Sequence, residues 1–113
     1  MGESDSVLIS KDAAMEYCGG DDEIFAAMVE MYAGDDRREE LESNYAKADW
    51  PAYRISAHTV KTTSRTIGAT ALSDAAMNLE YAARDNDVTY INEHHKSFIE
   101  DYGKVLKAAE DMC

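Results

Sequence analysis

One histidine and the basic residues around it are the part of this sequence whose residue types and spacing could do chemistry. The stretch 51–67 has the pattern of an amphipathic helix, and at about 100° per residue His58 falls opposite its apolar side. The residues that share the face of His58 are Arg54, Lys61, Thr62 and Arg65. The pattern therefore predicts an imidazole that points to solvent from the middle of a helix, among basic side chains.

An exposed imidazole in a basic setting suits phosphoryl transfer through a phosphohistidine. Nearby cations favour the neutral ring, which is the nucleophilic form, and they also balance the negative charge of a bound phosphoryl group. Lys61 is the best placed for this, because its flexible ammonium acts as a point charge one turn away. Solvent screening limits each contribution to about 1 kcal/mol. No buried acid, metal cluster or glycine-rich phosphate loop is evident, so we expect a carrier whose partners bring the catalytic machinery.

Capping residues and helix breakers predict six helical stretches. Two short helices are expected at about 10–18 and 23–33. Four longer ones are expected at about 35–48, at about 51–67, from a Thr70 cap to the polar turn 85–87, and at about 88–111. We therefore expect an all-α fold, an antiparallel up-and-down four-helix bundle with two shorter N-terminal helices packed on it. It would occupy residues 10–113 as one domain, after a flexible N-terminus at 1–9.

The helix expected at 51–67 has a distinct inner face. We expect this face to enter the core through Tyr53, Ala57, Val60, Ser64 and Ile67. A small serine on that face indicates a close approach by a neighbouring helix. The segment 62–66 is poor helix-forming sequence, because β-branched and hydroxyl side chains lose rotamer freedom or compete for backbone hydrogen bonds. Local preference is overridden there, which is typical of functional or tightly packed segments.

The chain is strongly acidic, with a formal net charge of -12. This charge repels phosphate backbones and anionic lipid surfaces and favours a monomer, so we expect neither nucleic-acid nor membrane binding. No apolar run approaches the roughly 20 residues needed to span a bilayer. Cys18 and Cys113 form no CxxC pattern and follow no signal peptide, which indicates two free thiols and a cytoplasmic protein.

A series of motifs in the second half of the chain carries a family resemblance. In order, these motifs are Ala57-His58-Thr59-Val60-Lys61, Ile67-Gly68-Ala69, Leu72-Ser73-Asp74-Ala75-Ala76 and Leu79-Glu80. Their order and spacing resemble the histidine-containing phosphotransfer (HPt) family, with weaker similarity at Gly20-Asp21-Asp22-Glu23 and Ala48-Asp49-Trp50. A histidine and a lysine three residues apart are weak evidence alone, but the following glycine and helix make the resemblance specific.

The resemblance implies a function and a site. His58 matches the phosphorylated histidine of the family, and Lys61 matches the lysine that assists it. Family members are helical bundles that carry phosphate between hybrid sensor histidine kinases and the receiver domains of response regulators. Magnesium in these reactions belongs to the acidic pocket of the receiver, and we assign no cofactor or metal to this chain.

The sequence departs from the family pattern at Thr62, where glycine is usual. A threonine adds bulk beside the imidazole, although its hydroxyl is placed to bond the His58 carbonyl and lie flat. We expect Arg54, Thr62 and Arg65 to contact the partner. The alternative is a non-phosphorylatable module of the same fold that binds a receiver or scaffolds an assembly. A hydrolase or di-metal enzyme is set aside, because paired carboxylates with Glu-x-x-His spacing are missing.

Two further groups of residues have simpler interpretations. His94 and His95 point about 100° apart on a helix and cannot share a metal ion well. His95 lies on an apolar stripe, so we expect a partly buried histidine with a satisfied hydrogen bond. The group Met28, Met31 and Tyr32 is most simply core, with a partner-docking patch as the alternative.

Overall fold

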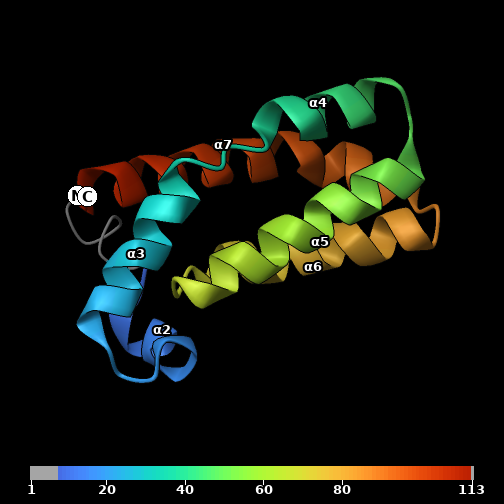
Figure 1. Cartoon of the computed structure of the whole chain (residues 1–113). Coiled ribbons are helices and arrows are strands. Elements are labelled where there is room, and N and C mark those ends of the chain that lie inside the picture. The colour runs from blue at the N-terminus through green and yellow to red at the C-terminus, as the bar shows by residue number, and fades with distance from the viewer. Residues whose placement is uncertain (1–7, 113) are drawn as a thin grey trace.

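The computed structural model describes residues 8–112 of the chain, and its regular structure there is entirely helical (Figure 1). The helices are α2 (Lys11–Cys18), α3 (Asp22–Ala33), α4 (Arg38–Ala46), α5 (Trp50–Thr66), α6 (Thr70–Arg84) and α7 (Val88–Met112). The expected all-α fold class is therefore confirmed.

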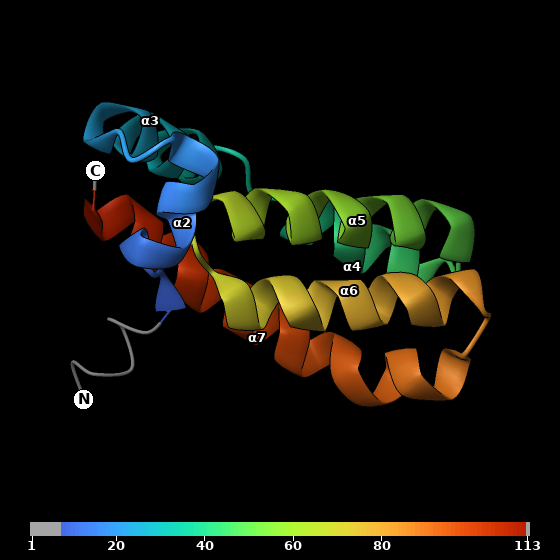
Figure 2. The same cartoon turned by 90° about the horizontal axis from the view of Figure 1, so that it is seen from below.

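The three long C-terminal helices form the body of the molecule. α5, α6 and α7 lie side by side, and successive helices run in opposite directions along the chain (Figures 1 and 2). α4 packs on α5 and α7, and α3 packs mainly on α7. The helix expected at 35–48 is shorter than predicted, with 9 residues. α3 and α4 together therefore take the place that the predicted helix 35–48 would occupy against the body formed by α5, α6 and α7.

The inner face of α5 packs as the sequence predicts. Its members Tyr53, Ala57, Val60, Ser64 and Ile67 are each completely buried. The Ser64 hydroxyl lies 2.9 Å from the phenolic oxygen of Tyr32 on α3, within the core. The small side chain therefore does admit a close neighbour, and it also gives that neighbour's hydroxyl a hydrogen-bond partner.

Two helix starts differ from the sequence prediction, and at the first of them a long-range contact holds the backbone. The phenol of Tyr102 on α7 donates to the Asp35 carbonyl and accepts from the Arg37 amide, both at 3.1 Å. These bonds hold residues 35–37 outside the helix, and α4 begins at Arg38. Thr70 is the first residue of α6 rather than its cap, since the N-cap position belongs to buried Ala69.

The N-terminal boundary also differs from the prediction. Residues 1–7 lie outside the described part of the chain, but Ile9, assigned to a flexible N-terminus, is buried in the core. The Ser10 amide next to it donates to the Gly68 carbonyl at 2.9 Å, which joins this segment to the α5–α6 turn. The folded unit therefore includes Ile9, because its apolar side chain is covered by the bundle.

Two remaining expectations concern membranes and thiols. Within residues 8–112, no helix is both long and apolar enough to cross a bilayer. Cys18 is a buried free thiol, while Cys113 lies outside the described residues.

We predict that Gly68→Ala destabilises the fold far more than Gly19→Ala does. Both glycines have positive φ, 78° and 62°, so alanine at either position costs about 1 kcal/mol of backbone strain. At Gly68 the added Cβ would also meet the Ser10 carbonyl oxygen at 1.8 Å, whereas nothing lies within 4 Å at Gly19. We expect a loss of about 3 kcal/mol or more for Gly68→Ala in urea unfolding. Equal losses for the two variants would contradict this packing.

Candidate functional site

His58 stands on the solvent side of α5, as predicted. Its side chain is 57% exposed, whereas Ala57 before it is completely buried. The imidazole borders a surface hollow of about 420 Å³ that is also lined by Arg54, Ile55, Thr59 and Glu80. The ring is thus accessible to a molecule that approaches from outside the bundle.

A carboxylate from α6 holds the inner side of the site. Glu80 Oε2 lies 3.0 Å from His58 Nδ1, and its Oε1 lies 3.0 Å from Lys61 Nζ. The side chains of Glu80 and Lys61 are only 12% and 17% exposed. The expectation that the chain has no buried acid is therefore wrong. Lys61 is also not an exposed cation beside the imidazole, because its ammonium is paired with this carboxylate.

The contact between Glu80 and His58 selects one tautomer of the ring. An ionised carboxylate can only accept a hydrogen bond, so the imidazole must carry a proton on Nδ1 and donate it to Glu80. In the neutral ring, Nε2 then holds the lone pair. No hydrogen bond reaches Nε2 from any residue in the described range 8–112. The geometry therefore presents a nucleophilic nitrogen on the exposed edge of a fixed ring.

The charge state of Glu80 follows from opposing effects. Burial raises the pKa of this carboxyl group, but the hydrogen bonds and positive charges of Lys61 and His58 together outweigh burial and lower it. Glu80 is thus ionised at neutral pH. Its negative charge in turn keeps the Lys61 ammonium at the edge of the site.

Packing between α5 and α6 places the three side chains of the site. The Ser73 hydroxyl on α6 donates to the Lys61 carbonyl on α5 at 2.9 Å, and Ser73 is completely buried. Buried alanines, Ala57 on α5 and Ala76 on α6, permit a close approach of the two helices. The spacing between His58 and Glu80 is thereby set by rigid elements rather than by a loop.

Glu80 is the site residue that sequence reasoning missed. The sequence motif Leu79-Glu80 contains this residue, but the motif alone indicates no role for it. A signal was present, because Glu80 lies four residues after Ala76 and three before Ala83, on the buried side of α6. An acid at a core position needs a positively charged partner, and α5 carries the cations that pack nearest to this face of α6.

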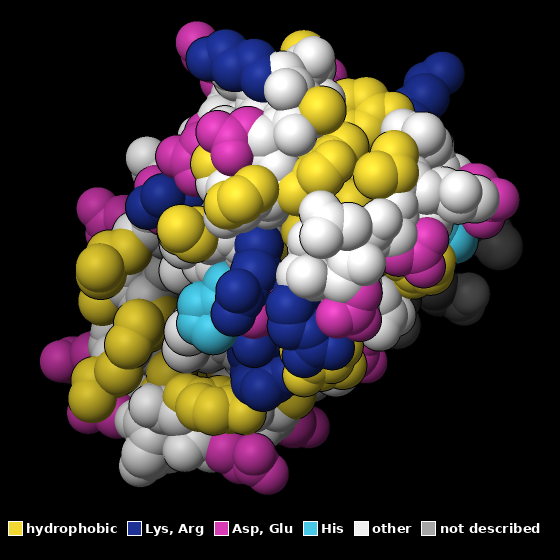
Figure 3. Space-filling model, turned by 90° about the vertical axis from the view of Figure 1, so that its right-hand side faces the viewer, with side chains coloured by type: hydrophobic (Ala, Val, Ile, Leu, Met, Phe, Trp, Pro, Cys, Tyr) yellow, Lys and Arg dark blue, Asp and Glu magenta, His cyan; other side chains and the backbone are white. Residues whose placement is uncertain are grey.

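The other predicted site residues lie around the imidazole on the surface. Arg54, Thr62 and Arg65 are exposed, and neither arginine forms an ion pair within residues 8–112. The Thr62 hydroxyl donates to the His58 carbonyl at 3.1 Å, as its position predicts. Figure 3 shows basic side chains gathered beside a histidine, with hydrophobic side chains on its other side. In a chain of charge -12, this cluster is a local exception.

The remaining histidines and methionines take other places. His95 is 4% exposed and its ring nitrogens contact Tyr53, at 2.8 Å, and Glu42, which confirms the buried, hydrogen-bonded interpretation. The group Met28, Met31 and Tyr32 does not share one environment. Tyr32 belongs to the core, whereas Met31 is 71% exposed. Core packing therefore accounts for only part of that group.

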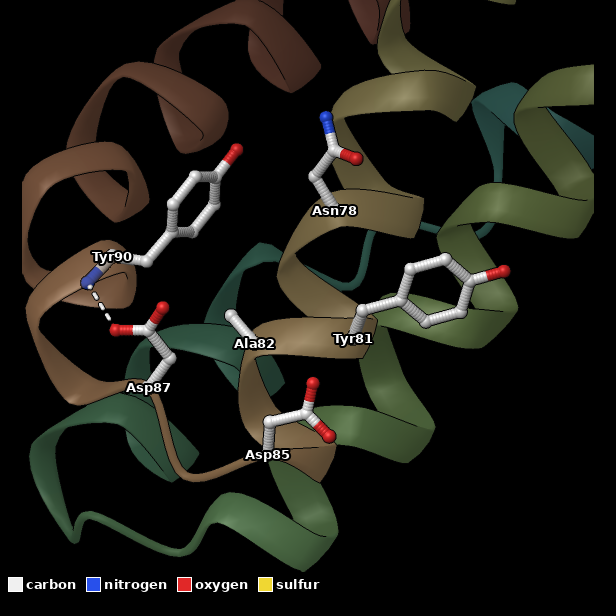
Figure 4. A pocket seen from close by; sticks show the side chains of 6 residues that line it. All are labelled: Asn78, Tyr81, Ala82, Asp85, Asp87 and Tyr90. Atoms are coloured by element: carbon white, nitrogen blue, oxygen red, sulfur yellow. Dashed lines mark hydrogen bonds between the residues drawn. The ribbon is translucent and has the colours of Figure 1, made fainter.

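A second hollow, of about 430 Å³, lies between α6 and α7 (Figure 4). Both of its carboxylates already have partners: Asp87 accepts from the Tyr90 amide at 3.2 Å, and Asp85 pairs with Arg84. Its lining contains no histidine, lysine or cysteine that could act as a nucleophile. The hollow at His58 is therefore the better candidate for a functional site.

Comparison with known proteins identifies the family of the chain. The family model described as the Hpt domain matches residues 28–109, and the chain therefore belongs to the Hpt domain family. Hpt domains are phosphotransfer modules of two-component signalling, and the matched range contains both His58 and Glu80. Searches of curated proteins and of solved structures found no significant match.

We predict that Glu80→Gln lowers the free energy of unfolding at neutral pH by about 1–3 kcal/mol, because the partly buried Lys61 loses its counter-charge. The folded state lowers the pKa of Glu80 below its ordinary value of 4.5, so its stabilising effect is present above that value. The effect is lost as the pH falls through the folded-state pKa. Urea unfolding from about pH 7 to pH 3 should therefore show the wild type and the variant converging in acid.

The matched control is Glu39→Gln, which removes the same charge from an exposed position on α4. It should leave stability nearly unchanged across this pH range. A constant difference between wild type and Glu80→Gln down to pH 3 would show that the Glu80 charge is not what stabilises the site.

Proposed function

We propose that the chain is a phosphorelay carrier in which His58 Nε2 accepts a phosphoryl group and passes it to an aspartate of a receiver domain. The observation that carries the proposal is the exposed imidazole whose Nδ1–H is bonded to Glu80, which leaves the Nε2 lone pair toward solvent. Membership of the Hpt domain family supports the same role.

The transfer needs no group from this chain other than the imidazole of His58 and the side chains that orient it and balance its charge. In the first step the Nε2 lone pair attacks phosphorus, an N–P bond forms, and the bond to the donor atom breaks with its electron pair leaving on the donor. In the second step a receiver carboxylate oxygen attacks phosphorus, the N–P bond breaks, and its electrons return to Nε2. The Nδ1 proton stays on the bond to Glu80 throughout, so no proton has to be exchanged with solvent.

Glu80 has two effects in this scheme. Its carboxylate orients the ring, as the acid does for the histidine of a serine hydrolase, and thereby keeps Nε2 unprotonated in the neutral form. After phosphorylation it stabilises the positive charge on Nδ1–H, which makes the phosphoryl group easier to transfer. Glu80 is thus a positioning residue, because it contacts the imidazole rather than the phosphoryl group.

Cations around the ring would balance the phosphoryl charge. Lys61 lies one turn after His58, with its ammonium on Glu80, and it supplies positive charge close to the transferred group. Arg54 and Arg65 are unpaired among the described residues and face the approaching partner. These side chains complement the acidic pocket of a receiver, where the magnesium ion of the reaction would be bound.

The partners follow from this scheme. We assign a sensor histidine kinase and a response-regulator receiver as donor and acceptor, acting in the cytoplasm on a monomeric chain. The net charge of -12 opposes self-association and supports the monomer. A lysine, two arginines and a bound carboxylate can tune a labile N–P bond, but the catalytic groups for transfer come from the partner.

We predict that incubation with a small phosphodonor such as acetyl phosphate, or with a phosphorylated receiver and magnesium, phosphorylates His58 on Nε2. The adduct should be stable in base and labile in acid, and NMR should identify the isomer. His58→Gln should abolish the adduct, whereas His94→Gln, which removes another exposed histidine, should retain it. An adduct on His94, or on Nδ1 of His58, would contradict the proposal. Receiver binding without any adduct would favour the docking module instead.

A further inference from the structure

Helix α4 has few apolar contacts with the rest of the bundle. All nine of its residues belong to the described part of the chain, and only Leu41 among them is buried, while Tyr45 is partly buried against the core. By comparison, α3 buries three side chains and α5 buries five. α4 lies on the outside of the bundle, between the irregular segments 34–37 and 47–49 (Figure 1). Apolar burial therefore contributes little to holding α4 in place.

Four side chains of α4 form hydrogen bonds with α5 or α7. The pairs are Glu40–Ser56, Asn44–Ser56, Glu42–His95 and Tyr45–Asn92. On the other side of this interface, Ser56 and His95 are only 2% and 4% exposed. Bonds of this kind are exchanged for bonds to water when an interface opens, so their net contribution to closing it is small. Opening would hydrate Ser56 and His95 and would not leave them unpaired.

The ends of α4 add little stability to the helix. Isolated helices shorter than about 12 residues are marginal in water, and α4 has 9. The side chain of Arg37, at the N-cap position, bonds Asp35 instead of capping the helix. Beyond the other end, Ala48 has a φ of 52°, in the left-handed region where glycine is preferred. The closed position of α4 thus carries backbone strain that an open segment would lose.

The contact between Glu42 and His95 joins α4 to a ring that other helices hold. An ionised carboxylate only accepts hydrogen bonds, so the imidazole donates from Nε2 to Glu42. Its Nδ1 then accepts from the Tyr53 hydroxyl of α5 at 2.8 Å. The Tyr45 ring of α4 stacks on the same imidazole, with 3.9 Å between ring centroids. Because Tyr53 orients the imidazole, the ring stays in place to receive α4 again after an opening.

We propose that α4 opens from α5 and α7 as one unit while the rest of the bundle stays folded, and that the contact between Glu42 and His95 controls how often it opens. The proposal does not depend on the function proposed above, because the acid that supports His58 belongs to α6. Opening would still change the surface near the site, since Ser56 lies two residues before His58 on α5.

Native-state hydrogen exchange on the full chain tests the proposal. The backbone amides of residues 41–49 should exchange through an opening that is at least about 100-fold more populated than the one that frees amides at the centres of α5 and α7. Exchange at residues 41–49 should also depend less on added urea, because a local opening exposes less surface than global unfolding does.

Ser73→Ala separates local opening from global unfolding. It removes the bond between the Ser73 hydroxyl and the Lys61 carbonyl, which joins α6 to α5 and does not involve α4. This bond persists while α4 alone is open. Its loss should therefore speed exchange at the centres of α5 and α7 about fivefold and leave exchange at residues 41–49 unchanged.

Glu42→Ala tests the control by His95. Glu42 is 57% exposed, so the substitution leaves no cavity in the core. The α4-open state and the unfolded state both lack this contact, so its removal should speed exchange at residues 41–49 and at the helix centres by the same factor, about tenfold. Glu39→Ala, the matched control on the same helix, should change exchange less than about threefold. Ala48→Gly removes the strain of the closed turn and should slow exchange about threefold.

Two results would overturn the proposal. If residues 41–49 exchange no faster than the helix centres, and Ser73→Ala speeds both sets equally, α4 opens only when the whole chain unfolds. If Glu42→Ala changes exchange no more than Glu39→Ala does, the contact with His95 does not control the opening.

Discussion

A buried carboxylate shared by an imidazole and an ammonium is the interaction on which the rest of the site depends. Glu80 contacts His58 and Lys61 at 3.0 Å each, from a position that is only 12% exposed. An ion so placed is tolerated only when both oxygens have partners, because its desolvation is otherwise uncompensated. The contacts that satisfy Glu80 also position its two partners. The imidazole of His58 donates from Nδ1, so Nε2 is left toward solvent, and the Lys61 ammonium stays at the edge of the site.

The fold keeps this interaction rigid. α5 and α6 approach closely through small residues, and the Ser73 hydroxyl joins the backbone of one helix to the other beside Lys61. The turn between them is closed by Gly68, whose carbonyl accepts from the Ser10 amide of the N-terminal segment. Elements far from the imidazole therefore contribute to its position, because they fix the angle and distance between the helices that carry the site.

The surface around the imidazole is divided by chemistry. Lys61 pairs with Glu80 on the α6 side, and Thr63 and Thr66 line a hollow with Met28 and Met31 on the α3 side, in a chain of net charge -12. A surface divided in this way offers an approaching molecule a charged contact on one side of the ring and an apolar contact on the other.

The sequence by itself determined the features that depend on periodicity. Helical spacing was enough to predict an all-α fold, the buried face of α5, the outward direction of His58 and the buried state of His95. It also predicted the bond from Thr62 to the His58 carbonyl, because that bond spans a single helical turn. These are local properties, set by residues three or four apart on one helix.

Tertiary structure decided the features that join distant segments. The pairing of His58 with Glu80 spans 22 residues and depends on how α6 turns against α5, which no pattern within either helix specifies. The delayed start of α4 depends on Tyr102, more than sixty residues later, and the burial of Ile9 depends on the packing around Gly68. Each is settled by desolvation and hydrogen-bond satisfaction in the assembled bundle, where the partners first become neighbours.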